Sequence, residues 1–245
     1  MDIIITGANG RMGRMLTETI ARDGEHTVAA RVSPSYYTDS VENTYPALSQ
    51  YDGPADAVID FSNRAATREL TDYCAARLLP LVIAATAQTE EDMALIRAAA
   101  EQIPVFLSAN MSIGVALLAE LAKKTAAMFP EADIEIIERH HNQKQDVPSG
   151  TALLLARRIR EARDGAEILV GRHENGKRGR EIGIHSLRYG SEVGTHEIII
   201  SDGRETVTLK HEAENRALFA RGAVAAAAFL QGRAPGLYDM RDIVT

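Results

Sequence analysis

Five short runs of apolar, largely β-branched residues recur through the N-terminal part of the chain. The stretches between them repeat apolar residues every three or four positions, as Met12, Leu16 and Ile20 do. Largely uncharged runs of this length are typical of strands buried on both faces, and their alternation with helices is typical of a parallel α/β sheet built from βα units. We predict strands at 2–6, 26–32, 55–61, 81–86 and 104–109, with a loop at 33–54 that can include a short helix.

The pattern changes after residue 110. A long apolar helix is predicted at 112–129, a strand at 132–141, and a second helix from 150 to Gly165. Three later runs, at 181–190, 194–201 and 204–212, alternate apolar with polar residues, and Asp202-Gly203 between the last two is typical of a hairpin turn. These segments predict helices on a mixed or antiparallel sheet, and a last helix is predicted to follow at 215–232.

A glycine-rich turn, TGANGRMG, follows the first predicted strand and opens the first helix. Its spacing of Gly7, Gly10 and Gly13 departs from the usual dinucleotide fingerprint and would also suit a turn that merely needs small residues. Its place between strand and helix favours a nucleotide, because Gly7 can make the tight turn, Gly10 can admit a pyrophosphate and Gly13 can allow close packing. Arg11 and Arg14 add positive charge there.

The end of the second predicted strand bears on the choice of nucleotide. An acidic residue there commonly binds the ribose 2′-hydroxyl of NAD, but the stretch AARVSPS carries Arg31 and Ser33 and no carboxylate. A guanidinium pairs well with a 2′-phosphate, so Arg31 favours NADP(H). The alternative is an arginine that points into solvent.

Charge and composition argue against several classes of partner. The chain has 27 basic and 34 acidic residues, a net charge of -7 and 45% hydrophobic residues. This balance gives it no general attraction to nucleic acid or to an anionic membrane, and no apolar run is long enough to span a bilayer. Cys74 is the single cysteine and falls in a helical pattern, so we expect a buried thiol and a reducing, cytoplasmic location.

A second motif, HHNQKQDVPSGTA at 140–152, follows the strand predicted at 132–141. His140 can exchange protons near neutral pH, and Lys144 supplies a cation that burial could turn into a proton donor. Ser149, Gly150 and Thr151 begin the next helix, where main-chain N–H groups and a hydroxyl would face an anion. A small carboxylate or phosphate beside a proton-transfer pair, together with a dinucleotide turn, is what a hydride-transfer enzyme requires.

Two adjacent histidines also suggest a metal site, since imidazole is the commonest ligand of zinc. Adjacent residues of a strand point to opposite faces, so His140 and His141 are poorly placed to share one ion. Neither Cys74 nor a His-x-x-x-His helix supplies further ligands. We therefore predict no metal.

These motifs resemble those of the dihydrodipicolinate reductase family, also called 4-hydroxy-tetrahydrodipicolinate reductases. TGANGRMG resembles the family's nucleotide turn, SANMSIGV at 108–115 its Asn-x-Ser-x-Gly-Val segment, and ERHHNQKQDVPSGTA at 138–152 its long signature. GTHEIII, HEAENRALFARGA and PGLYDMRDIV follow the family pattern too. The resemblance covers nearly the whole chain.

The resemblance implies a Rossmann-like parallel-sheet nucleotide domain at 1–108, completed by 216–245, and a second α+β domain at 109–215 that binds substrate and builds an oligomer, usually a homotetramer. It implies reduction of a small cyclic dicarboxylate, 4-hydroxy-tetrahydrodipicolinate, by NADPH or NADH in lysine and diaminopimelate biosynthesis, with hydride passing to ring C4.

By position, His140 would be the catalytic proton donor and Lys144 a second donor. The substrate binders would be His141, Gly150 and Thr151, beside Ser149. The nucleotide site would be lined by Gly7, Ala8, Asn9, Gly10, Arg11, Met12, Ala84, Ala85, Thr86, Ser108, Ala109, Asn110 and Met111, in addition to Arg31.

Two departures from the family pattern bear on the nucleotide site. The family usually has Gly-Thr-Thr-Gly after the fourth strand, where this chain reads AATA at 84–87, and alanine there restricts the backbone and could crowd the cofactor. The acidic residue that many members carry at the second strand is missing, which leaves NADPH and NADH both open. Two other functions stay open: a dehydrogenase acting on an acyclic substrate such as aspartate, and a nucleotide-sensing protein without catalysis.

Overall fold

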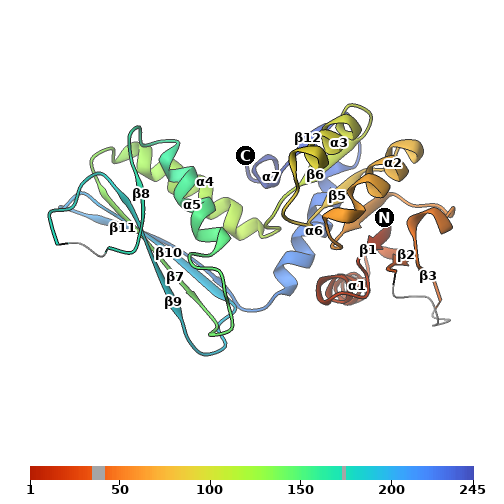
Figure 1. The fold of residues 1–245 in the computed structure, drawn as a ribbon, viewed down its shortest axis with the longest axis horizontal. Helices are drawn as coiled ribbons and strands as arrows, with labels where there is room; N and C mark the ends of the chain where they lie inside the picture. The colour runs from red at the N-terminus through yellow and green to blue at the C-terminus, as the bar shows by residue number, and fades with distance from the viewer. Residues whose placement is uncertain (35–41, 173–174) are drawn as a thin grey trace. The chain divides into compact units, whose positions relative to one another are not determined.

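The computed structural model describes residues 1–34, 42–172 and 175–245 (Figure 1). It divides the chain into two compact units. The first contains residues 1–112 and 217–243 with Thr245, and the second contains residues 113–216 with Val244. Residues 35–41, within the loop predicted at 33–54, lie outside the described part. None of the helices in the described ranges combines the length and the apolarity needed to cross a membrane.

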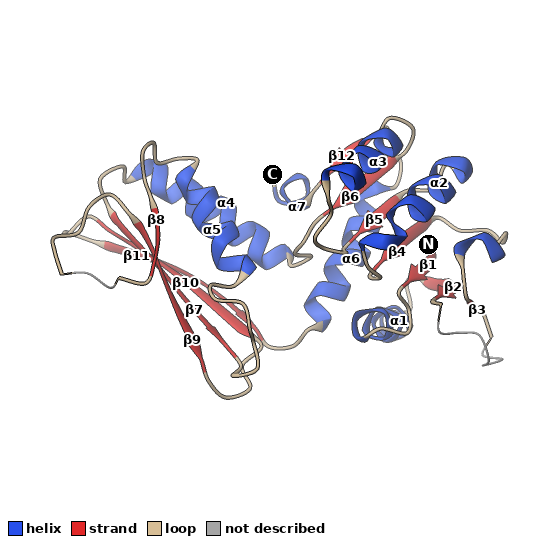
Figure 2. Ribbon diagram, in the orientation of Figure 1, coloured by secondary structure: helices blue, strands red, loops and turns tan. Residues whose placement is uncertain are grey.

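Seven strands form one parallel sheet in the first unit, in the order β12-β6-β5-β4-β1-β2-β3 (Figure 2). The strands are β1 (Asp2–Thr6), β2 (Thr27–Val32), β3 (Thr44–Tyr45), β4 (Ala57–Asp60), β5 (Leu81–Ile83), β6 (Pro104–Leu107) and β12 (Gly236–Tyr238). Ile3, Ile4 and Ile5 are each 0% exposed, as expected for a strand covered on both faces. The parallel sheet predicted from the alternating pattern is confirmed.

Helices cover both faces of this sheet. They are α1 (Arg11–Asp23), α2 (Thr67–Arg77), α3 (Glu90–Ala100), α6 (Ala217–Leu230) and α7 (Met240–Val244), with short 3-10 turns at Leu48–Gln50 and Arg64–Ala66. α1 packs on α6 and α2 packs on α3, the two pairs lying on opposite faces (Figure 2). Strand order reverses between β1 and β4, and such a switch point opens a crevice at the carboxyl ends of the strands.

Five strands form a mixed sheet in the second unit, in the order β11-β10-β7-β9-β8. They are β7 (Asp133–His140), β8 (Ile168–Val170), β9 (Ile182–Arg188), β10 (Gly194–Ser201) and β11 (Thr206–Ala213). β10 runs antiparallel to β7 and β11, whereas β9 runs parallel to β7 and β8. Helices α4 (Ile113–Met128) and α5 (Gly150–Arg160) pack together on one face, so the second predicted architecture is confirmed as well.

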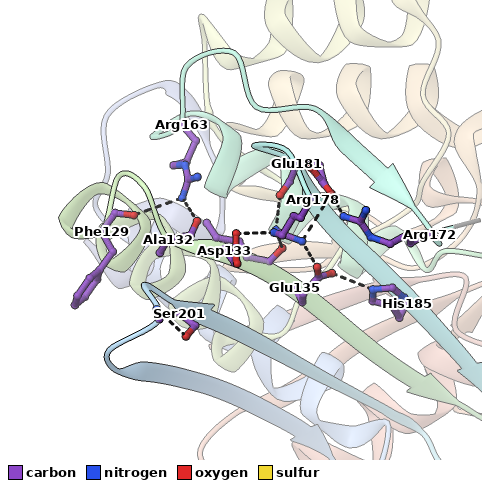
Figure 3. Close-up of polar contacts among 12 residues, drawn as sticks. Phe129, Ala132, Asp133, Glu135, Arg163, Arg172, Arg178, Glu181, His185 and Ser201 are labelled. Carbon is purple, nitrogen blue, oxygen red and sulfur yellow. Dashed lines mark hydrogen bonds and ion pairs between the residues drawn. The ribbon is translucent and has the colours of Figure 1, made fainter. Parts of the chain in front are cut away.

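The second of these helices ends earlier than the sequence suggested. α5 stops at Arg160, and Gly165, with φ of 74°, lies in a later turn. The side chain of Arg163 explains the difference, because it is only 4% exposed and donates from Nη1 to the carbonyl of Ala132 (2.8 Å), beside Phe129 (Figure 3). If the helix continued, it would carry the Arg163 guanidinium away from the carbonyl groups of Phe129 and Ala132. The prediction of a helix running to Gly165 was therefore wrong.

Candidate active site

A buried polar row lies at the end of β7 in the second unit. Ile134, Ile136, Glu138 and His140 are all buried and alternate with more exposed residues, because side chains two apart on a strand share a face. The strand packs on α5. Its buried row begins with two isoleucines and ends in a carboxylate and an imidazole. A buried carboxylate needs partners that replace its lost hydration.

Glu138 is 0% exposed and finds those partners on several segments. Arg188, the last residue of β9, donates from Nη1 to Oε2 (2.9 Å) and from Nη2 to Oε1 (2.7 Å). The N–H of Ser149 donates to Oε1 (3.1 Å), and Nδ1 of His140 makes a short hydrogen bond with Oε2. Burial by itself raises the pKa of Glu138, but hydrogen bonds led by those from His140 and Arg188 hold that pKa well below its usual value. The group is a carboxylate.

His140 is fixed from both sides. Its Nδ1 bonds Glu138, and its ring lies edge-on to His196 of β10, with centroids 5.2 Å apart and planes at 74°. Gly194 leaves the space that the ring needs, since a β-carbon there would lie 2.8 Å from Nε2. With Nδ1 engaged, Nε2 is the ring nitrogen left to exchange a proton with a ligand.

His196 is a buried, neutral neighbour of His140. It is 4% exposed, and burial, followed by the charge of His140, lowers the pKa of His196 to about 3. Its Nε2 lies 3.1 Å from Oγ of Ser149, and its Nδ1 has no partner within the part of the chain that the structure describes. The lowered pKa makes the His196 ring neutral at about pH 7, so it places no positive charge beside His140.

Lys144 lies in the loop that follows β7. Its N–H donates to the carbonyl of His141 (3.1 Å), and its Nζ lies 2.7 Å from Oδ1 of Asp146. Burial raises the pKa of Asp146, but the hydrogen bond and the charge of Lys144 together with main-chain hydrogen bonds outweigh it, so the net shift is downward. The charges of His140 and Lys144 both lower the pKa of His196, so both predicted proton donors lie within electrostatic range of that ring.

The three predicted anion-binding residues begin α5. Ser149 is 1% exposed and caps the helix, its Oγ accepting from the N–H of Ala152 (3.1 Å). Gly150 is exposed, and no described atom lies within 4 Å of the position a β-carbon would take there. Thr151 and His141 are both partly exposed. Gly150 thus leaves room for a close approach to the positive end of the helix dipole, where its own N–H faces the carboxylate of Asp146.

Among the described residues, ligand atoms of Glu138, His140 and His196 lie within 4.8 Å of one another, which is close enough for them to share one metal ion. The donor set fits a cation poorly, because Arg188 already bonds both oxygens of Glu138. A second cation beside that guanidinium would meet repulsion in a buried place. We therefore keep the proposal that the chain holds no metal here.

The glycine turn of the first unit has the geometry that a nucleotide site needs. Gly7 has φ of 68°, and a β-carbon on it would lie 2.6 Å from the main chain of Phe61. A β-carbon on Gly13 would lie 2.3 Å from the carbonyl oxygen of Gly7. No described side chain caps α1, which begins after Gly10. The turn therefore presents an uncapped helix N-terminus at the carboxyl end of β1, and these residues fit a pyrophosphate.

Asp60 joins the two strands at the switch point. It is 0% exposed, and its Oδ1 accepts from Oγ1 of Thr6 (2.6 Å) and from the N–H of Ser62 (2.9 Å). Its Oδ2 has no partner among the described atoms. Burial raises the pKa of Asp60 against the opposing effect of these bonds. Asp60 thus fixes the loops after β1 and β4.

A pocket of about 240 Å³ opens beside this junction. Its lining includes Gly7, Val32, Pro34, Ser62 and Glu69. Arg31 is absent from this lining, because alternate residues of β2 face opposite ways, and its Nη2 donates to the carbonyl of Glu42 (2.6 Å). The pocket lies where the ribose of a dinucleotide binds in folds of this kind.

The remaining predicted nucleotide residues follow the next two strands of the parallel sheet. Ala84 follows β5 and donates from its N–H to the carbonyl of Asp60 (2.9 Å), while Ser108 follows β6 and donates from its N–H to Ile83 (3.2 Å). Residues 84–86 and 108–111 therefore share the carboxyl edge of the sheet with residues 7–12. Met111 is 2% exposed, and a β-carbon on Gly222 of α6 would lie 1.6 Å from its carbonyl oxygen.

Family models match both parts of the chain. Residues 1–111 match the model described as dihydrodipicolinate reductase, N-terminus, and residues 114–244 match dihydrodipicolinate reductase, C-terminus. The chain belongs to the dihydrodipicolinate reductase family. It is therefore an NAD(P)H-dependent oxidoreductase, and the resemblance predicted from the motifs is confirmed.

Individual members of the reductase family match over their full lengths. A 4-hydroxy-tetrahydrodipicolinate reductase of Caldanaerobacter subterraneus subsp. tengcongensis is 40% identical over 245 residues, covering 99% of this chain and 97% of the relative. One of an Exiguobacterium species is 41% identical, covering 99% and 95%. The structure of a dipicolinate-bound dihydrodipicolinate reductase from Paenisporosarcina sp. TG-14 has a TM-score of 0.86 and 25% identity, covering 99% of both chains.

Sequence reasoning missed four residues of these reductase sites: Glu138, Arg188, His196 and Asp60. One signal was available, because Glu138 precedes His140 by two positions on a strand and must share its face. Arg188 and His196 lie far along the chain from the motif. They reach it only through strand pairing, which sets Arg188 beside His140 and His196 beside Glu138.

The AATA departure from the reductase family pattern has a structural consequence at its last residue. Ala87 has φ of 66°, a left-handed conformation that costs a residue with a β-carbon about 1–2 kcal/mol. We expect Ala87→Gly to raise the free energy of unfolding by roughly 0.5–1 kcal/mol, after allowing for the greater unfolded-state entropy of glycine. Urea unfolding measures this, with Ala84→Gly as the control, which should lose stability because Ala84 has no positive φ. Equal losses in both variants would contradict the strain.

His196 should make this reductase acid-sensitive. Its pKa of about 3 in the fold lies below the ordinary 6.5, so the unfolded chain binds the extra proton and stability is lost as pH falls from about 6.5 towards 3. At about pH 5.5 the loss is roughly 1.4 kcal/mol. We expect His196→Gln to lose about that much less than the parent between about pH 7.5 and 5.5 in urea unfolding. Parallel pH dependences for the two proteins would count against a buried neutral ring.

Proposed function

We propose that this chain reduces 4-hydroxy-tetrahydrodipicolinate with NADPH or NADH, as a step of lysine and diaminopimelate biosynthesis. The observation that supports the proposal most strongly is the placement of His140, a buried imidazole at the end of β7, directly before the loop that carries Lys144 and leads to α5; its Nε2 has no hydrogen-bond partner among the described contacts. The names of the matched relatives and the dipicolinate bound to the Paenisporosarcina protein support the same substrate class.

Each predicted substrate residue has a chemical task in this proposal. The N–H groups at Gly150 and Thr151 bind a carboxylate of the substrate at the positive end of α5, with Ser149 holding the helix start and His141 beside the loop. When bound, the nicotinamide nucleotide would supply hydride to ring C4, after the 4-hydroxyl group of the substrate has left as water and the ring has become unsaturated. His140 then supplies the proton that quenches the developing charge, and its Nε2 is the donating atom.

Lys144 is the second proton donor in this scheme. Its ammonium group pairs with Asp146, whose lowered pKa makes it a carboxylate. A substrate carboxylate entering near Gly150 offers the ammonium a second partner. Lys144 therefore both attracts the dianionic ligand and holds a proton for it.

The nucleotide belongs to the carboxyl edge of the parallel sheet. We propose that residues 7–12 bind the pyrophosphate and that residues 84–86 and 108–111 lie along the nicotinamide half of the nucleotide. We also propose that Arg31 binds the 2′-phosphate of NADPH. Both NADPH and NADH are expected to serve, because the described pocket lining has Glu69 and no lysine or arginine.

The contribution of Arg31 can be measured as a ratio. If its guanidinium turns from the Glu42 carbonyl to a 2′-phosphate, Arg31→Ala should lower the preference for NADPH over NADH by about tenfold, since a charge-assisted pair is lost. The measurement is kcat/KM with each nucleotide. A variant with the parental ratio would show that Arg31 does not choose the cofactor.

The direct test of function is oxidation of NADPH or NADH in the presence of freshly prepared dihydrodipicolinate precursor. Loss of the reduced-nucleotide absorbance with this substrate, and not with a panel of acyclic carbonyl and imine compounds, is expected. Turnover of an aspartate-like substrate would favour the other dehydrogenase. Tight nucleotide binding without turnover of any compound would favour a nucleotide sensor.

We also propose a cytoplasmic homotetramer. The sheet face of the second unit away from α4 and α5 carries partly exposed apolar residues, including Ile137, Ile199 and Leu187, the last 41% exposed, and such a face is commonly covered by another copy. Sedimentation equilibrium of the purified chain tests this, and a monomer at micromolar concentration would contradict it.

A further inference from the structure

Glu138 occupies the centre of the second unit's polar site. It bonds His140 on its own strand, Arg188 on β9 and the main chain of Ser149 at the start of α5. Nothing in the reaction requires a carboxylate to touch the substrate here, and Glu138 is 0% exposed. Its role must therefore pass through the groups that it holds.

We propose that Glu138 and Arg188 are positioning residues for the proton donor: Glu138 fixes which ring nitrogen of His140 exchanges the proton, and Arg188 balances the charge that Glu138 places beside it. This inference rests on the proposed function of His140. It assigns a task to two residues that make no contact with the reacting atoms.

The first part follows from hydrogen-bond geometry. A carboxylate only accepts hydrogen bonds, so the short contact between Oε2 of Glu138 and Nδ1 of His140 requires a proton on Nδ1. The other nitrogen, Nε2, is then the one that gains and loses a proton. Without Glu138, the ring could flip or change tautomer, and the exchanging nitrogen would no longer be defined.

The second part follows from charge. A buried carboxylate alone would stabilise imidazolium so strongly that His140 would give up its proton reluctantly. The two hydrogen bonds from Arg188 neutralise that carboxylate, and the same Nη2 also donates to the carbonyl of Asp146 (2.7 Å). Arg188 therefore ties the balance of charge at His140 to the loop that carries Lys144.

Other charged or titratable groups also surround the ring and must be held constant in any test. They come from β10, from the loop before it and from the loop after β7, and they are His196, Glu192 and Lys144. None of them bonds Nδ1 of His140 among the described contacts. Changes at Glu138 and Arg188 therefore isolate the proposed pair.

The test compares Glu138→Gln, Arg188→Gln and the double variant in the full-length protein. Loss of the carboxylate leaves Arg188 facing the ring and disfavours imidazolium, so the alkaline fall of kcat should move to lower pH by about one unit or more. Loss of the guanidinium should move it to higher pH by about one unit or more. The double variant, with no net change in charge, should return close to the parental profile.

The chain supplies a matched control on the exposed side of the same sheet. Glu135 lies 2.9 Å from Nε2 of His185 and also pairs with Arg178 (Figure 3), so it repeats the glutamate, histidine and arginine chemistry outside the proposed site. Glu135→Gln should leave the pH profile of kcat unchanged. A shift as large as that of Glu138→Gln would show that any change of sheet charge is enough, which would overturn the proposal.

A second readout does not depend on turnover. The imidazole of His140 can be titrated by NMR, its signal being assigned as the one lost in His140→Gln, and its midpoint should move downward in Glu138→Gln and upward in Arg188→Gln. Midpoints that move this way in a protein without reductase activity would refute the proposed function but not the pairing. Unmoved midpoints in an active enzyme would refute the pairing. If Glu138→Gln does not fold, Arg188→Gln and the double variant still allow the same test.

Discussion

Replacing His140 by glutamine should lower kcat by about a hundredfold or more, the usual cost of losing a general acid. Glutamine can still bond Glu138 and fill much of the space beside Gly194, but its amide does not exchange a proton near neutral pH. The fold should persist, because β7 keeps its pairing with β9 and β10. Steady-state kinetics with saturating nucleotide and substrate measure the loss, and circular dichroism checks the fold.

Lys144→Ala should lower kcat/KM by a similar factor, but the loss should be divided between kcat and KM. Because Lys144 both attracts the dianion and carries a proton, KM should rise while kcat falls. His140→Gln should act mainly on kcat, since the buried ring contributes less to initial capture. Asp146 would be left without its ammonium partner in Lys144→Ala, which the control Asp146→Asn separates from loss of the cation itself.

His185→Gln is the matched control for the histidine. It lies on β9 beside Glu135, on the exposed side of the sheet (Figure 3), and its replacement should leave kcat at the parental value. Near-normal turnover in both His140→Gln and Lys144→Ala would remove the two proposed donors together. A loss confined to Lys144→Ala would leave the lysine as the sole donor.

The sequence predicted the features that depend on neighbouring residues. Buried strands such as β1 and the turn at Gly7 appear in the structure, because local backbone preference and burial favour the same result there. β3, β8 and β12 were missed, β3 within the segment predicted to be a loop, since two or three residues are too few to show a periodicity. Their formation depends on strand partners from elsewhere in the chain.

The residues of the candidate site also fall into two groups, those that a local motif predicts and those that only strand pairing brings to the site. His140, Lys144 and the start of α5 lie within one motif, so residue type and spacing could identify them. Arg188 and His196 contribute through the register of β9 and β10 against β7, and register is set by side chains and turns distant from the motif. A single sequence shows that these residues can ionise, but not that they meet at Glu138.

Gly13→Ala should have the largest effect in the nucleotide unit. Its β-carbon would lie 2.3 Å from the carbonyl oxygen of Gly7 and 2.5 Å from Cα of Ala8, and these are main-chain atoms that cannot move aside without opening the turn. We expect a loss of about 3 kcal/mol or more in the free energy of unfolding, at the upper end for overpacking. NADH affinity, measured by fluorescence titration, should fall about tenfold or more because α1 would be displaced from the end of β1.

Gly10→Ala separates the two effects of that substitution. Its β-carbon would lie 3.1 Å from the Gly7 carbonyl oxygen and meet no second described atom within 4 Å, so stability should fall by less than about 1 kcal/mol. If the pyrophosphate approaches the main chain at Gly10, the added methyl should still weaken NADH binding. A Gly13→Ala protein with parental stability would show that the turn can open at little cost. A Gly10→Ala protein with parental NADH affinity would place the pyrophosphate elsewhere, and the function proposed for residues 7–12 would fail with it.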